Sequence, residues 1–333
     1  MSAALPPGLI LRLHGRLGNH ILQWVTGQTL VQMVPGLGLH NYSLPPWGLQ
    51  CGGFRGRQPF LPAIVAQDTD LAAVAQLMRS GAMPLARLRC MVLQADMWGH
   101  PERFRRLLPL RGQAVETAGP GEILLNVRAD EILQARHPDY GPIPLGFYTS
   151  VLKNTGLRPV FMGQLGDDAY CRLLRDTFPA ARFLQSQGAT GDFDAMRKAR
   201  HLALSVSTFS WAAGWLSEAE SVHMPLLGFM NPAQRGDISL ISQEDARFSY
   251  YGFPQRQWQA LPAQQADLRD LAPVPVLTPA EVNAVCGAAK AARTSAQAAD
   301  LDRLRRAARK SLRFVPFLRR IYAVKCVAMV NKG

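Results

Sequence analysis

The sequence predicts an α/β protein with parallel sheets. Between residues 122 and 227, short apolar runs alternate with helical stretches of about ten residues, which is the pattern of consecutive βαβ units. An apolar run at 9–13 is followed by a glycine-containing turn and another helical stretch. The chain has 333 residues, 48% of them hydrophobic, which is enough material for about two domains.

The N-terminal part begins with a strand and a helix. The run at 9–13 is short and continuously apolar, as in a buried strand. Residues 15–19 are expected to form a tight loop, and 20–34 carry apolar side chains at helical spacing until Pro35 and Gly36 end the helix. Further along, we expect irregular structure at 35–62, a helix at 70–78 and a strand at 88–93.

From residue 122 on, each expected strand is followed by an expected helix. The strands are placed at 123–127, 159–162, 182–185, 202–206 and 223–227, and the helices at 147–154, 167–177, 193–200 and 209–218. In parallel sheets of this kind, ligands bind beyond the carboxyl ends of the strands. The turns that follow the strands are therefore the places where functional residues are expected.

Composition divides the chain into three expected parts, at 1–120, 121–278 and 279–333. The 37 Lys and Arg residues exceed the 24 Asp and Glu residues, for a net charge of +13. Such a balance favours phosphates, nucleotides or anionic surfaces as partners. The charge sits at the terminus without interleaved aromatic side chains, and no standard nucleic-acid motif is present, so no nucleic-acid partner is expected.

The third part is a basic helical tail. Apolar side chains recur at helical spacing between basic ones, at Leu301, Leu304, Ala308, Leu312 and Val315. The sequence allows two interpretations of this tail. In the first, residues 300–333 bind peripherally to an anionic membrane. In the second, the apolar stripe packs back on the body of the protein.

Several other classes of protein are disfavoured. The five cysteines are scattered, odd in number and never in a C-x-x-C pair, which argues for a reducing compartment and against a zinc site. No secretory signal is visible, and the uncharged segment 17–54 is too rich in polar residues, proline and glycine to span a bilayer. We therefore expect a cytoplasmic protein, with the inner membrane face as the place of any peripheral contact.

The first candidate loop follows the first strand, from His14 to His20. Gly15 and Gly18 let the backbone approach a ligand, Arg16 and Asn19 add donors, and the next helix presents its N-terminus to an anion. A strand-to-helix turn with two glycines is equally compatible with a purely structural role.

The second candidate loop follows the strand at 123–127 and carries Asn126, Arg128, Asp130 and Glu131. An arginine at the carboxyl end of a strand can hold a phosphate through two hydrogen bonds. Alternatively, Arg128 forms an ion pair with Asp130 or Glu131.

The third candidate loop leads from a strand into a helix at 205–215. Ser207 or Thr208 is placed to cap the helix, and the hydroxyls and amides of that turn are suited to a diphosphate. The alternative is an ordinary capped core helix.

These segments together resemble the GDP-fucose fucosyltransferase superfamily, most closely the α-1,2-fucosyltransferases (glycosyltransferase family 11). Gly15-Arg-Leu-Gly-Asn19 with Gln23 is similar to the family's opening G-x-L-G-N-Q-x-x-Q. Ser207-Thr-Phe-Ser-Trp211 is similar to its S-T-F-S-W-W, and Asp192-x-x-x-Met196 to its D-x-x-x-M. The order of the motifs agrees with the family, and the resemblance spans residues 9 to about 228.

The resemblance implies a GT-B-like fold, with two facing Rossmann-like domains and the nucleotide held mainly by the second. Residues 1–120 would be the acceptor side and 121–278 the donor domain. The implied activity is inverting transfer of fucose from GDP-fucose to a sugar hydroxyl of a cell-surface or lipid-linked glycan. The linkage that the resemblance favours is α-1,2. The partners would be a GDP-sugar and an oligosaccharide or glycolipid acceptor, without metal or other cofactor.

The resemblance also implies roles for individual residues. Arg128 would hold the β-phosphate and stabilise the transition state, and Asn19 would reach the diphosphate or the sugar. Asp192 would accept hydrogen bonds from the guanine edge. Ser207, Thr208 and the amide of Phe209 would complete the phosphate cradle, while Gly15, Arg16, Gly18 and Asn126 would line the donor site.

Two alternatives to this function remain open. Asn126 replaces a histidine of the family and Val206 an asparagine, so a different GDP-sugar is one alternative, and a non-catalytic basic binding protein is another. The general base also stays open between His14, His20, Asp130 and Glu131.

Overall fold

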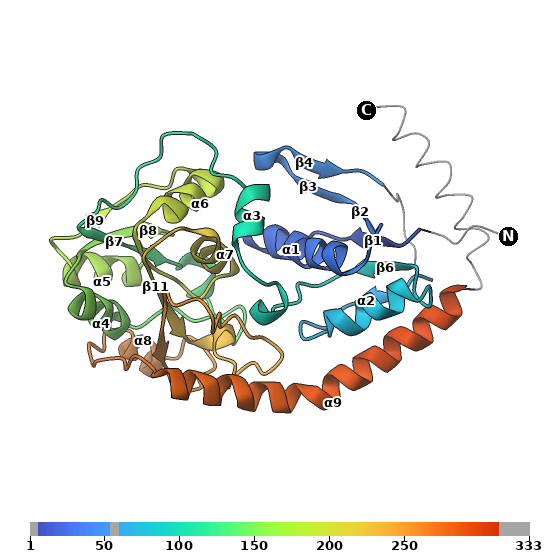
Figure 1. The fold of residues 1–333 in the computed structure, drawn as a ribbon. Coiled ribbons are helices and arrows are strands. Elements are labelled where there is room, and N and C mark those ends of the chain that lie inside the picture. The colour runs from blue at the N-terminus through green and yellow to red at the C-terminus, as the bar shows by residue number, and fades with distance from the viewer. Residues whose placement is uncertain (1–5, 54–59, 313–333) are drawn as a thin grey trace. The chain divides into compact units, whose positions relative to one another are not determined.

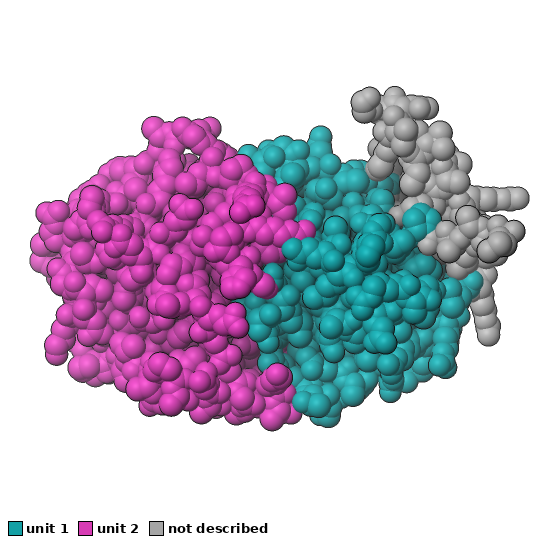
Figure 2. Space-filling model, in the orientation of Figure 1, with its two compact units in different colours: residues 1–98, 292–333 teal, residues 99–291 magenta. Residues whose placement is uncertain are grey.

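The computed structural model describes residues 6–53 and 60–312. The chain forms two compact units, Met1–Trp98 with Ala292–Gly333 and Gly99–Ala291, which Figure 2 distinguishes by colour. Each unit is built around a parallel sheet with helices packed on it (Figure 1). The predicted α/β class with parallel sheets is thus confirmed.

The boundary between the units differs from the expected one near residue 120, because residues 99–120 pack on the second unit. Phe104 of α3 (Glu102–Leu107) lies with its ring centroid 5.4 Å from that of Trp215. Arg197 donates to the carbonyl of Leu108 at 2.7 Å. These contacts belong to the core of the second unit, so the chain changes unit before α3.

Unit 1 contains a four-stranded parallel sheet of order β2-β1-β6-β5 and a separate hairpin of β3 and β4. Its elements in chain order are β1 (Gly8–Leu11), α1 (Leu17–Met33), β2 (Gly38–His40), β3 (Tyr42–Leu44), η1 (Pro45–Trp47), β4 (Leu49–Cys51), β5 (Ala63–Ile64), α2 (Leu71–Arg79), β6 (Leu85–Leu88) and η2 (Ala95–Met97). Three expectations need correction here. The segment 35–62 contains short strands where irregular structure is expected, β6 ends where the strand 88–93 is expected to begin, and α1 starts three residues early.

Unit 2 contains a six-stranded parallel sheet of order β12-β11-β10-β7-β8-β9. Its elements after α3 are β7 (Glu122–Val127), η3 (Asp130–Ile132), α4 (Leu145–Thr155), β8 (Arg158–Gly163), α5 (Ala169–Thr177), β9 (Arg182–Phe183), α6 (Gly188–Lys198), β10 (His201–Ala203), α7 (Thr208–Leu216), β11 (Ser221–Leu226), η4 (Gly228–Met230), β12 (Phe248–Gly252) and α8 (Pro262–Asp267). The expected strands and helices of 122–227 are all present. Strand β12 and helix α8 follow the segment 122–227 and are additional to the predicted elements.

The strand order of unit 2 reverses beside β7. From β7 the chain builds outward through β8 to β9, then returns to the other side of β7 for β10, β11 and β12. Right-handed crossovers therefore place α4 and α5 on one face and α6 and α7 on the other (Figure 1). Such a reversal leaves a crevice at the carboxyl ends of the two central strands, where open α/β sheets bind their ligands.

The last described element is α9 (Pro279–Leu312), which contributes its later residues to unit 1. There Arg303 donates to the carbonyl of Ala63 at 3.0 Å, and Thr69 donates to Asp300 at 2.9 Å. Leu304 and Ala308 are buried. The apolar stripe therefore packs on the protein at Leu304 and Ala308, as the second interpretation expects, whereas Leu312 is 39% exposed and Val315 lies outside the described residues. No helix of the described ranges has the length and apolarity needed to cross a membrane.

Candidate functional site

The strand reversal of unit 2 brings together the second and third candidate loops. Arg128 follows β7 and Val206 follows β10, the two strands between which the sheet order reverses. Nη1 of Arg128 donates to the carbonyl oxygen of Val206 at 3.2 Å. Two loops that lie 78 residues apart in sequence are thus in direct contact.

Arg128 is held from three sides. Besides the Val206 carbonyl, its Nη2 donates to Oε1 of Glu131 at 3.0 Å, and its guanidinium lies 4.9 Å from the ring centroid of Tyr140. The side chain nevertheless keeps 23% of its surface exposed. A guanidinium that is oriented and still accessible is suited to binding an anion. The predicted ion pair of Arg128 with Glu131 is confirmed.

Helix α7 begins next to Arg128. Ser207 is its N-cap, and its Oγ accepts a hydrogen bond from the amide of Phe209 at 3.2 Å. The Phe209 amide is therefore engaged by the cap. Ser207 and Thr208 are each 8% exposed. The helix end adds its partial positive charge to that of Arg128.

Asn126 forms a buried network beneath these loops. Its Oδ1 accepts a hydrogen bond from Ser205 at 2.6 Å, and its Nδ2 donates to the carbonyl of Met162 at 3.3 Å. Ser210 of α7 donates to the carbonyl of Ser205 at 2.9 Å. The network ties β7, β8 and the start of α7 together, so both ends of the Asn126 amide are used inside the unit.

Glu131 is fixed as a carboxylate. Burial alone would raise the pKa of Glu131, but hydrogen bonds from Gln164 and Arg128 outweigh it and hold that pKa below its ordinary value. Nε2 of Gln164 donates to Oε2 of Glu131 at 3.0 Å. A carboxylate that is hydrogen-bonded on both oxygens and has a lowered pKa is a poor proton acceptor.

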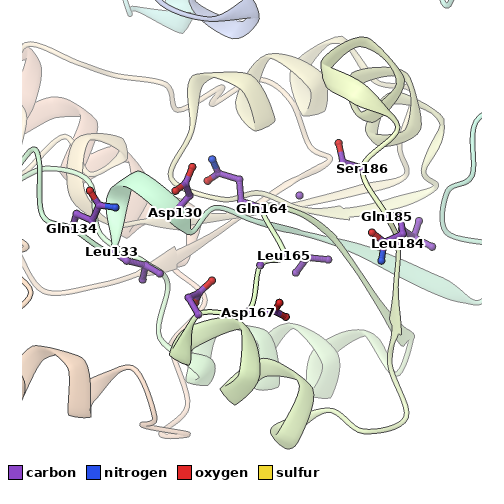
Figure 3. A pocket seen from close by; sticks show the side chains of 12 residues that line it. Asp130, Leu133, Gln134, Gln164, Leu165, Asp167, Leu184, Gln185 and Ser186 are labelled. Atoms are coloured by element: carbon purple, nitrogen blue, oxygen red, sulfur yellow. The ribbon is translucent and has the colours of Figure 1, made fainter.

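A hollow of about 680 Å³ opens at the carboxyl ends of β7, β8 and β9. Its lining residues are Asp130, Leu133, Gln134, Gly163, Gln164, Leu165, Gly166, Asp167, Asp168, Leu184, Gln185 and Ser186. In Figure 3, Leu133 and Gln134 lie toward one end and Leu184, Gln185 and Ser186 toward the other. The size and the mixture of apolar and polar groups suit a small organic ligand.

Asp192 lies behind one wall of this hollow. Its two carboxylate oxygens accept hydrogen bonds from the hydroxyl of Ser186 and the amide of Gln187, both at 2.7 Å. The side chain is buried, and Ser186 is the residue of this group that lines the hollow. Asp192 therefore positions the loop before α6, and its predicted contact with a guanine edge stays a prediction.

The first candidate loop lies in unit 1. Gly15 has a φ of +82°, and a Cβ added to it would lie 2.3 Å from Nδ2 of Asn19. Gln23 is 1% exposed, and its Nε2 donates to the carbonyls of His14 and Asn19 at 2.9 and 3.0 Å. The family-like glycine and glutamine thus hold the loop in shape. The first turn of α1 already includes Gly18, Asn19 and His20, which corrects the expectation of a loop through residue 19.

The two histidines of this loop differ in environment. His14 and Arg16 are exposed. Burial, followed by the charge of His14, lowers the pKa of His20 below the ordinary value of 6.5. His20 therefore stays neutral, and able to accept a proton, at lower pH than an unperturbed histidine. A contact of this loop with a donor stays a prediction.

Some residues of the site carry no functional signal in the sequence. Tyr140, whose ring lies under Arg128, and Ser186, which donates to Asp192, carry no motif of their own. Gln164, which lies between Glu131 and the amide of Ala129, belongs to residues 163–168, whose position after a strand indicates a ligand-facing wall. Within residues 6–53 and 60–312, no group of three or more His, Cys, Asp or Glu side chains is placed to hold a metal ion.

No protein-family model and no curated protein matches the sequence. Among solved structures, a mutant of Arabidopsis thaliana FUT1 in complex with GDP is 11% identical and covers 66% of this chain and 70% of its own, with a TM-score of 0.41. A glycosyl transferase family 9 protein from Veillonella parvula is also 11% identical and covers 68% of this chain and 81% of its own, with a TM-score of 0.35.

Proposed function

We propose that the chain is a GT-B-like glycosyltransferase that takes fucose, or another sugar, from a GDP-linked donor and transfers it to a sugar hydroxyl. The observation that carries the proposal is the contact of Arg128 with the Val206 carbonyl at the strand reversal of unit 2. There an oriented guanidinium and the N-terminus of α7 converge. Together with the motif resemblance, this arrangement supports a diphosphate site.

The proposed chemistry needs positive charge at that place. The acceptor oxygen attacks the anomeric carbon of the donor as the bond from that carbon to the β-phosphate oxygen breaks, so negative charge develops on the leaving GDP. Arg128 and the α7 N-terminus stabilise this charge. The acceptor hydroxyl gives up its proton to a base, for which His14, His20 and Asp130 remain the proposed candidates, since Glu131 is engaged by Arg128 and Gln164.

The hollow of unit 2 is the proposed place of the nucleoside. Hydrogen bonds connect Arg128 to Glu131 and Glu131 to Gln164, and Gln164 itself lines the hollow. A diphosphate at Arg128 would therefore leave its nucleoside within reach of Leu165 and Ser186. Asp192 acts on that wall through Ser186.

Calorimetric titration with GDP, and with UDP as the comparison, tests the proposal. We expect GDP to bind wild type without added metal, UDP to bind weakly, and Arg128→Ala to lose about 1.5–3 kcal/mol of GDP binding, the usual contribution of a hydrogen bond to a charged group. Arg158→Ala is the matched control because Arg158 is 79% exposed at the amino end of β8, on the same unit. Equal GDP binding by both variants would contradict the donor site.

The acceptor is proposed to be an oligosaccharide or glycolipid, with the tail as a peripheral contact on an anionic membrane. Since Leu304 and Ala308 are buried in the protein, the part of α9 available for this contact is its basic exposed face, which includes Arg306, Arg309 and Lys310. Replacing these three by Gln should weaken sedimentation with vesicles that contain phosphatidylserine. Unchanged sedimentation would remove residues 306–310 from the contact.

A further inference from the structure

Three arginines lie at the carboxyl edge of the unit 1 sheet. Strands β1 and β6 pair in parallel with Ile10 opposite Arg87, and the amide of Arg12 donates to the carbonyl of Leu88 at 3.0 Å. Alternate residues of a strand point to the same face, and residues that are paired in register share a face. Arg12, Arg87 and Arg89 therefore share one face of the sheet.

That face is the one turned away from α1. Leu11 points to the opposite face, where a Cβ added to Gly27 of α1 would lie 3.3 Å from its Cδ1. Arg12 and Arg89 are exposed and Arg87 is half-buried. The three side chains, which we call the edge arginine cluster, thus lie on the side of the sheet that α1 does not cover, with Arg12 and Arg89 open to solvent and Arg87 partly so.

The charge of the edge arginine cluster is not compensated. Within the described residues, no ion pair joins any of the three to an acidic side chain, and Nε of Arg87 is buried without a hydrogen-bond partner. The sequence explains this lack of ion pairs in part, because no acidic residue precedes Asp68. Burial, followed by the charges of Arg89 and Arg12, lowers the pKa of Arg87 below the ordinary value for arginine.

Like charges held together without a counter-charge destabilise the folded unit, and a bound anion offsets that repulsion. Guanidinium groups match phosphates and carboxylates through pairs of parallel hydrogen bonds. Within residues 6–53 and 60–312, the Arg87 side chain makes one hydrogen bond, through Nη2, which donates to the carbonyl of Leu61 at 3.1 Å. Its Nη1 and the two exposed guanidiniums are left for a ligand.

We propose that the edge arginine cluster binds a phosphate or carboxylate group of the molecule that receives the sugar. The acceptor class would accordingly be an acidic glycan or a phosphate-linked one. The assignment to the acceptor rests on the proposed glycosyl transfer, whereas the anion site itself stands on unit 1 alone. Arg12 lies two residues before His14, a candidate base, so an anchored acid group would be bound next to the loop that is proposed to act on the acceptor.

Chemical modification of individual arginines tests this site in the wild-type protein, so the result does not depend on whether a variant folds. Wild-type protein saturated with GDP is treated with phenylglyoxal, and the rates at individual arginines are followed by peptide mass spectrometry. The probes are inorganic pyrophosphate and D-glucuronate, with D-glucose as the neutral control. We expect one or both anions to slow modification of Arg12 and Arg89 severalfold, with no change at Arg306, an exposed arginine of α9.

The two anions distinguish the chemical group that the cluster binds. Protection by pyrophosphate alone identifies a phosphate-bearing acceptor, and protection by glucuronate alone identifies a carboxylate. Rates at Arg12 and Arg89 that equal those without anion, or equal slowing at Arg306, overturn the site. GDP protection of Arg128 reports separately on the donor site, so its failure would reject the proposed function and leave the anion site standing.

A variant pair adds a test of the cluster as a unit. If the arginines bind one anion together, Arg89→Gln should reduce the anion protection of Arg12 severalfold. Arg306→Gln removes the same charge from α9 and should leave that protection unchanged. Full protection of Arg12 in the Arg89→Gln variant would contradict a shared site.

Discussion

Nη2 of Arg128 donates to Oε1 of Glu131 at 3.0 Å, and Oε2 of the same carboxylate accepts a hydrogen bond from Gln164 at 3.0 Å. Gln164 in turn accepts from the amide of Ala129 at 3.0 Å. This chain of contacts connects the loop after β7 with the loop after β8. The orientation of the proposed phosphate-binding arginine is therefore coupled to the wall of the hollow.

Glu131 supports Arg128 in the proposed site, and kinetics test this role against that of a general base. We expect Glu131→Gln to keep kcat within a few-fold of wild type because the amide retains a hydrogen bond to Arg128. We expect Glu131→Ala to raise KM for the GDP-sugar by roughly tenfold, since one partner of a charged hydrogen bond is lost. Steady-state kinetics with GDP-fucose and a responsive acceptor provide the measurement. A fall in kcat of about a hundredfold or more in Glu131→Gln would instead identify a base.

Filling the hollow should block the nucleoside and spare the phosphate contact. Leu165 lines the hollow and is partly exposed, so Leu165→Trp places a larger ring there without a change of charge. We expect GDP affinity to fall at least tenfold, while the affinity for inorganic pyrophosphate changes little. Calorimetry with both ligands gives the comparison. Leu165→Met is the size-matched control, and unaltered GDP binding by the tryptophan variant would place the nucleoside elsewhere.

His223 should make the stability of the protein depend on pH. Burial, and then the charge of His201, lowers the pKa of His223 to about 4 from 6.5. The unfolded chain therefore binds a proton that the folded chain does not between these values. Stability from this group is complete above pH 6.5 and is lost as the pH falls toward 4.

From pH 7 to pH 5 this difference amounts to about 2 kcal/mol of unfolding free energy. Urea unfolding of wild type and His223→Gln at both pH values measures it. The variant should lose less stability on acidification than wild type, although it is less stable at pH 7. His100→Gln, at an exposed position, should behave as wild type does. A parallel loss in His223→Gln and wild type would show that another group is responsible.

The alternation of strands and helices in unit 2 could be predicted because strands such as β7 and β8 bury short apolar runs and helices of about ten residues lie between the strands. The short strands β2, β3 and β4 could not, since three residues are too few to show a period and proline and glycine dominate the segment around them. The early start of α1 has a similar cause. Arg16 caps the helix without a side-chain hydrogen bond, so no capping residue marks the boundary.

In the candidate site, too, some residues could be predicted from the sequence and others could not. Arg128 and Ser207 stand at strand ends and within motifs, so their types and positions indicate a phosphate site. Tyr140 and Ser186 act through contacts that only tertiary structure creates. The edge arginine cluster has the same origin, because Arg12 and Arg87 are brought together by the pairing of β1 with β6.

Gly15 allows strain to be separated from function in the first loop. Gly15 and Gly36 both have positive φ, +82° and +74°, so alanine at either should cost about 1 kcal/mol of stability. A Cβ at Gly36 meets no atom within 4 Å, whereas one at Gly15 would lie 2.3 Å from Nδ2 of Asn19. The end of the Asn19 side chain can move aside at small cost, but it then leaves its place in the loop. We therefore expect similar unfolding free energies for Gly15→Ala and Gly36→Ala in urea, and reduced transferase activity in Gly15→Ala alone. Equal activity of the two variants would show that the position of Asn19 does not matter for transfer.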